Sequence, residues 1–96
     1  MSKQIYKYDI FPDSWKSREY PISIDAPRGA IPVHIDVQGG GVKLWAEVDT
    51  DQPIEKQTVL ICVGTGHGVI PEFGYRHFQS IQAPPYVWHF YKLVSR

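Results

Sequence analysis

Disulfides, charge imbalance and cysteine-based metal centres are all missing from this sequence of 96 residues. A single cysteine excludes an intrachain disulfide and a zinc site built on several cysteines. Ten basic and ten acidic residues give a formal net charge of zero, and no run of lysine or arginine is present. The chain therefore lacks the positive field with which proteins bind duplex nucleic acid or anionic lipid. We expect neither a duplex nor a membrane as partner.

Long apolar segments are absent as well. No stretch approaches the roughly eighteen apolar residues of a membrane-spanning helix, and residues 1–8 lack the apolar core of a signal peptide. With the lone thiol, this predicts a protein of the reducing cytoplasm. Eight glycines and eight prolines exclude long helices, whereas 43% hydrophobic residues are too many for a disordered chain. We expect one domain over residues 1–96 and, because so small a core is marginal, a homo-oligomer.

Alternation of apolar and polar residues is the main structural signal, because successive side chains of a strand point to opposite faces. It predicts an all-β fold, either a small antiparallel β-sandwich or a partly open barrel of five to seven strands. Pro21 inside the second run indicates an edge strand, and the apolar run 59–63 indicates a central one. Residues 13–18 are compatible with a short helix. The expected strands are 3–10, 19–25, 31–37, 42–48, 56–64, 75–82 and 86–94.

The hairpin of residues 31–48 is the best-specified element. A loop of two residues, Gly39-Gly40, or of four keeps the apolar residues of both strands on one face, whereas a three-residue loop would not. Its other face then carries an ion pair and an aromatic pair. The predicted pairs are Val37 with Val42, Ile35 with Leu44, Val33 with Ala46, Asp36 with Lys43 and His34 with Trp45.

The segment VGTGHGVIP, residues 63–71, is the most distinctive stretch for function. Its alternate glycines leave backbone N–H groups uncovered around one hydroxyl and one imidazole, an arrangement that suits an anion. A plain structural turn and a flexible lid are the other interpretations. The P-loop and dinucleotide-binding motifs both fail, because no lysine is correctly placed and Pro71 follows where a helix should open.

No cofactor, metal centre or catalytic set is predicted. The four histidines match neither HExxH nor a close His-His spacing, and the acidic residues 49–55 lack the glycine and glutamate of a calcium loop. Cys62 lies in the most apolar strand, where burial raises a thiol pKa and leaves it inert. No serine stands in a GxSxG elbow. We therefore expect a protein that is not an enzyme.

Aromatic residues concentrate in the last predicted strand. An apolar face of this size is covered by something, either the core on one side and a subunit interface on the other, or a flat ligand. We expect oligomer contacts through residues 86–94 or through the edge near Pro21. The two faces carry Tyr86, Trp88 and Phe90 on one side and Val87, His89, Tyr91 and Leu93 on the other.

Three stretches together resemble a family of short, uncharacterised bacteriophage and prophage proteins. They are residues 26–38 (APRGA leading into VHIDVQ), residues 44–49 (LWAEVD) and residues 64–71 (GTGH followed by IP). The resemblance implies an accessory protein acting in an infected bacterium: a sponge for a nucleotide immune signal, an inhibitor of a host protein, or a virion component. The three consecutive glycines at the hairpin and the Pro-Pro before the last strand depart from the family's pattern.

These observations predict non-catalytic binding of a small anionic ligand, with a signalling nucleotide as the first choice. An inhibitor that binds a host protein through an exposed aromatic patch is the alternative. In the nucleotide interpretation, the glycine loop and arginines contact phosphate while a tryptophan stacks on a base. The predicted ligand-binding residues are Gly64, Thr65, Gly66, His67, Gly68, Arg76, Arg28, Trp45 and Trp88.

Overall fold

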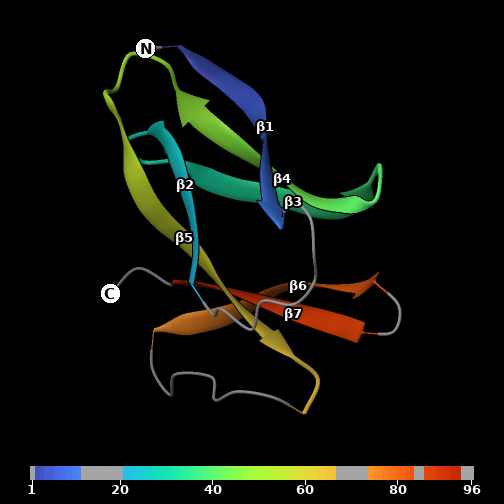
Figure 1. Ribbon diagram of the computed structural model, residues 1–96. Coiled ribbons are helices and arrows are strands. Elements are labelled where there is room, and N and C mark those ends of the chain that lie inside the picture. Colours follow the sequence, from blue (N-terminus) through green and yellow to red (C-terminus); the bar gives the residue numbers. More distant parts are fainter. Residues whose placement is uncertain (1, 12–20, 67–73, 84–85, 94–96) are drawn as a thin grey trace.

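The computed structural model describes residues 2–11, 21–66, 74–83 and 86–93 (Figure 1). These residues form an all-β fold of seven strands, as the alternation predicts. The expected helix at 13–18, the first two residues of the predicted second strand and the last of the seventh lie outside the described residues. The strands are β1 (Lys3–Phe11), β2 (Pro21–Pro27), β3 (Ile31–Gln38), β4 (Gly41–Asp49), β5 (Ile54–Gly64), β6 (Tyr75–Ala83) and β7 (Tyr86–Leu93).

The strands form two antiparallel sheets, of order β1-β4-β3 and β2-β5-β7-β6, that do not close into a barrel. β2, the strand that begins at Pro21, is an edge, and β5 lies inside its sheet, so both predictions are confirmed. Figure 1 shows β5 running from the level of the three-stranded sheet to β6 and β7. No helix in the described part of the chain is long and apolar enough to cross a membrane.

The core lies between the two sheets and is built from the inward positions of both. β4 has the clearest alternation, since four alternate residues from Val42 to Val48 are buried and the residues between them are partly exposed. The aromatic strand β7 contributes Trp88 and Phe90 to this core, so one of its faces needs no partner. β7 also has a strand on each side, which leaves only its outer face for contact with another molecule.

The hairpin follows the predicted register near its turn and departs from it further away. Gly39 and Gly40 both have positive φ, as a two-residue type I′ turn requires. Val37 with Val42, Ile35 with Leu44, Asp36 with Lys43 and His34 with Trp45 are confirmed as cross-strand pairs.

The predicted pairing of Val33 with Ala46 is wrong. Pro32 lies opposite Ala46, and Val33 is the extra residue of a β-bulge. The bulge moves Ile31 to the opposite face, beside Glu47. Of the four apolar residues expected on the inner face of β3, only Ile35 is fully buried, and Val37 next to the turn is 40% exposed.

The ion pair predicted across the hairpin also differs from the observed one. Lys43 pairs with Asp9 on β1, the other neighbour of β4, whereas Asp36 lies 3.7 Å from the imidazole of His34. Lys43 lies on the central strand β4 and therefore has a neighbour on each side, Asp9 on β1 and Asp36 on β3. The sequence of the hairpin contains only Asp36, so the choice between the two could not be predicted from it. The aromatic pair is as predicted, with the His34 and Trp45 ring centroids 5.6 Å apart.

Candidate functional site

A groove of about 420 Å³ opens between the two sheets, next to the beginning of β3. Its walls come from residues 30–32 at the start of β3 and residues 57–59 in the middle of β5. Arg76 of β6 and residues 92–93 of β7 complete it. Ile31, Val59 and Leu93 make much of the lining apolar, while the side chains of Arg76 and Lys92 bring two positive charges.

Gln57 holds the turn that forms one wall of this groove. Its side-chain oxygen accepts hydrogen bonds from the N–H groups of Gly29 (2.9 Å) and Ala30 (3.1 Å). Its NH₂ group donates to the carbonyl oxygens of Ala26 and Pro27, at 2.7 and 3.0 Å. Because one side chain satisfies four backbone groups of a turn, the turn is held in place beside β5.

Arg76 and Lys92 lie directly opposite each other on β6 and β7. Like charges in this position repel each other. Among the described residues neither side chain has an ion-pair partner, and no acidic residue is among those that line the groove. A bound anion would relieve the repulsion while making charge-assisted hydrogen bonds with both groups.

A β-bulge at Phe78 creates this pair of cations. From Ala83 opposite Tyr86, an unbroken ladder would set Arg76 opposite Leu93; the extra residue moves it opposite Lys92. Arg76 was a predicted phosphate partner, but Lys92 was missed. No feature of the sequence marks a bulge at Phe78, so the pairing of the two charges was not accessible from the strand pattern.

Of the other predicted ligand-binding residues, those that the structure describes are not among the residues lining the groove. Gly64 is buried in β5 opposite Trp88, and Gly66 has a positive φ of 79°. The N–H of Thr65 donates to the carbonyl oxygen of Val87 at 3.2 Å, so this amide is not open to an anion. His67 and Gly68 lie outside the described residues.

Three side chains of the predicted set have other structural roles. Arg28 forms an ion pair with Glu55, at 3.3 Å, next to the β2–β3 turn. Trp45 packs against His34 on the three-stranded sheet, with the two ring planes tilted by 42°. Trp88 is only 6% exposed and belongs to the core, so the proposed stacking of a base on its ring is wrong. Large aromatic side chains commonly fill a protein core, and Trp88 has this packing role.

Cys62 and Asp49, whose pKa values are both shifted, are not among the residues lining the groove. Burial raises the pKa of Cys62 to about 12, which agrees with the inert, buried thiol that the sequence predicts. The pKa of Asp49 is lowered, chiefly because the backbone N–H of Asp51 donates to its carboxylate at 3.0 Å. This bond shapes the turn after β4, so the shift has a structural cause.

The fold and the groove together define a class: a small all-β protein of two antiparallel sheets with a cationic pair at the groove between them. Residues 1–96 match the family model described as Domain of unknown function (DUF7352), and the chain belongs to that family. Comparison with curated proteins finds no match, and neither does comparison with solved structures.

Proposed function

We propose that the protein binds a small anionic ligand, without a chemical step, in the groove at Arg76 and Lys92. The observation that carries this proposal is the placement of two cations opposite each other at a groove whose described lining contains no acidic side chain. An arrangement that is unfavourable in the empty protein becomes favourable when a phosphate or carboxylate group lies between the charges.

The groove also suits a ligand with an apolar part. Its volume of about 420 Å³ falls within the roughly 300–1,000 Å³ typical of small-molecule sites. Ile31 and Leu93, both substantially exposed, offer apolar surface next to the cations. Such a site matches an organic anion better than inorganic phosphate alone. A signalling nucleotide, the ligand implied by the resemblance to phage accessory proteins, is the first class to test.

A panel of cyclic dinucleotides, cyclic trinucleotides, ADP-ribose derivatives and inorganic phosphate tests the proposal by thermal shift and calorimetry. A ligand at one hundred times its Kd adds about 2.7 kcal/mol to the free energy of unfolding. Arg76→Ala and Lys92→Ala are each expected to weaken binding at least tenfold, because each removes a charge-assisted contact. Lys56→Ala removes an exposed lysine of β5 outside the groove and is the matched control.

Two outcomes would overturn the proposal. One is a folded protein that no ligand of the panel stabilises. The other is a ligand that binds to Arg76→Ala and Lys92→Ala as tightly as it binds to the Lys56→Ala control. Recovery of a chemically altered ligand would show that the protein is an enzyme, which would also contradict binding without a chemical step.

The outer face of the three-stranded sheet favours a second candidate function, which is binding to another protein. Ile5, Glu47 and Ile31 form one row across the three-stranded sheet, and both isoleucines are about half exposed. The row beside it includes the Trp45–His34 pair. A host protein bound through this aromatic and apolar face is therefore the alternative. Trp45→Ala would abolish that binding and leave ligand binding in the groove unchanged.

A further inference from the structure

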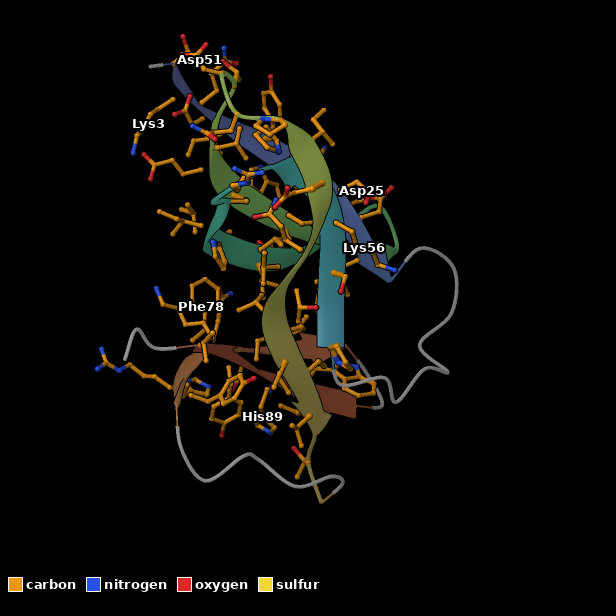
Figure 2. All side chains as sticks on the ribbon, turned by 90° about the vertical axis from the view of Figure 1, so that its left-hand side faces the viewer. Lys3, Asp25, Asp51, Lys56, Phe78 and His89 are labelled. Carbon is orange, nitrogen blue, oxygen red and sulfur yellow. The ribbon has the colours of Figure 1, made fainter. Side chains whose placement is uncertain are left out.

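A chain of four polar side chains lies on the four-stranded sheet, separate from the groove. Thr65 Oγ1 is 2.7 Å from Nε2 of His89, and Nδ1 of the same imidazole is 2.8 Å from Ser80 Oγ. The same serine oxygen lies 2.8 Å from Nε2 of His77. Figure 2 shows His89 in the part of the molecule formed by the four-stranded sheet, away from the three-stranded one.

The bulge at Phe78 is also the reason that these residues meet. Residues three apart in a regular strand, such as His77 and Ser80, point to opposite faces. The extra residue between them reverses this alternation, so that His77 lies opposite Tyr91 and Ser80 lies opposite His89 on one face of the sheet. Two imidazoles that are distant in sequence thereby converge on one oxygen atom.

Each imidazole ring also has a neighbour other than Ser80 that fixes its orientation: Thr65 for His89 and Tyr91 for His77. The Thr65 hydroxyl contacts the far nitrogen of His89, and Thr65 is itself attached to β7 through the bond from its N–H to Val87. The ring of Tyr91 meets that of His77 edge-on, with centroids 5.3 Å apart and planes at 81°. Rings fixed in this way lose little freedom when they bind a third group.

The hydrogen-bonding capacity of Ser80 shows what this arrangement is suited to bind. Its hydroxyl carries one hydrogen, so it can donate to only one of the two imidazole nitrogens, and the other nitrogen must carry its own proton. When His77 Nε2 and His89 Nδ1 are both unprotonated, their two lone pairs are directed at Ser80 Oγ. The hydroxyl proton can then form a hydrogen bond with only one of them. A cation with a preference for imidazole nitrogen would satisfy both.

We propose that His77 and His89 bind a divalent transition-metal ion of the zinc, nickel or copper class. Imidazole nitrogen suits these ions, whereas calcium and magnesium prefer oxygen ligands. His77 uses Nε2 and His89 uses Nδ1, each of which lies 2.8 Å from Ser80 Oγ. Rotation of the Ser80 side chain about its Cα–Cβ bond gives the position between the two nitrogens to the ion. Among the described residues no third histidine, cysteine or carboxylate joins the pair, so water fills the other coordination positions.

The contact between Thr65 and His89 has a defined role in this site. If His89 carries its proton on Nε2 and donates it to Thr65 Oγ1, the Nδ1 lone pair is directed at the metal ion. Removing such an outer partner typically weakens metal binding about ten- to one hundredfold. Thr65 is thus a positioning residue for the site.

Calorimetry of the full chain with ZnCl₂ and with NiCl₂ tests the proposal. We expect one ion per chain, and at least tenfold weaker binding for His77→Gln and His89→Gln, which keep a polar group near Ser80. Thr65→Val should weaken binding about tenfold while leaving the stoichiometry unchanged. His34→Gln is the matched control, because His34 lies exposed on the other sheet and contacts Trp45. Circular dichroism checks that each variant keeps its strands.

An NMR titration of the wild-type protein gives a readout that needs no substitution. Zinc should shift the ring resonances of His77 and His89 together at one equivalent, while those of His34 stay in place. The proposal is overturned if the two glutamine variants bind as tightly as the wild type, or if the His34 variant weakens binding equally. Substitutions at Arg76 and Lys92 should not affect this binding, so failure here and failure of the groove are distinguishable.

Discussion

The side-chain amide of Gln79 on β6 forms hydrogen bonds with both backbone groups of Ile35 on β3. Its oxygen accepts the N–H of Ile35 at 3.0 Å, and its NH₂ group donates to the carbonyl oxygen of the same residue. Each of the two strands is the edge of its own sheet. The amide therefore occupies the position that a neighbouring strand would take, and it joins the two sheets along one side.

Replacing Gln79 by alanine should lower the free energy of unfolding by about 1–3 kcal/mol, because a partly buried N–H and C=O lose their only polar partner from β6. Chemical denaturation measures the change. Gln82→Ala is the matched control, since Gln82 is exposed on the same strand, and its effect should stay within about 0.5 kcal/mol. Equal effects of the two substitutions would show that the amide does not join the sheets.

Cys62 should make stability depend on pH in the alkaline range. Burial raises its pKa from the ordinary value of 9.0 to about 12. The folded state therefore keeps the thiol proton between these values while the unfolded state loses it, and the contribution to stability is lost as the pH rises from 9.0 to about 12. Denaturation curves at several alkaline pH values measure this loss.

Cys62→Ala controls for the tyrosines and lysines that titrate in the same range, so only the difference between the two proteins reports the thiol. In the native protein at pH 8, a thiol reagent should react no faster than the chain unfolds, because Cys62 is 2% exposed. Rapid labelling of the folded protein would contradict the burial of this strand.

The repulsion between Arg76 and Lys92 should be measurable without any ligand. Lys92→Gln should raise the stability of the ligand-free protein by about 0.2–1 kcal/mol at low salt, and the gain should disappear at high salt. Lys56→Gln is the control, because Lys56 lies opposite Asp25 and its loss should give no gain. With a groove ligand bound, the sign reverses and the Lys92 variant becomes the less stable protein.

Local signals in the sequence predict the elements of the fold well. Side-chain alternation predicts β4, and the apolar run 59–63 predicts β5. The turn at Gly39-Gly40 follows from the positive φ that glycine adopts readily. The edge position of β2 follows from Pro21, which cannot donate a hydrogen bond to a further strand. These features depend on residues close together in the chain.

The candidate sites could not be predicted in the same way. Arg76 was identified by its charge alone, and its partner Lys92 and the meeting of His77 with His89 both depend on the bulge at Phe78. Trp88 carries the same sequence signal as an exposed stacking residue, but in the fold its ring is part of the core between the two sheets. Composition does not distinguish a ring that faces a ligand from one that faces another sheet.

The sequence by itself determined the all-β class, the position of most strands and the register near the hairpin turn, because alternation and turn chemistry act between near neighbours. The tertiary structure alone decided the strand order, the bulges and the faces on which charged and imidazole groups meet. A bulge costs a ladder hydrogen bond and is stabilised by packing against strands far away in the chain. One extra residue reverses every side chain beyond it. At Phe78 this reversal sets Arg76 opposite Lys92 in one candidate site and His77 on the same face as Ser80 and His89 in the other.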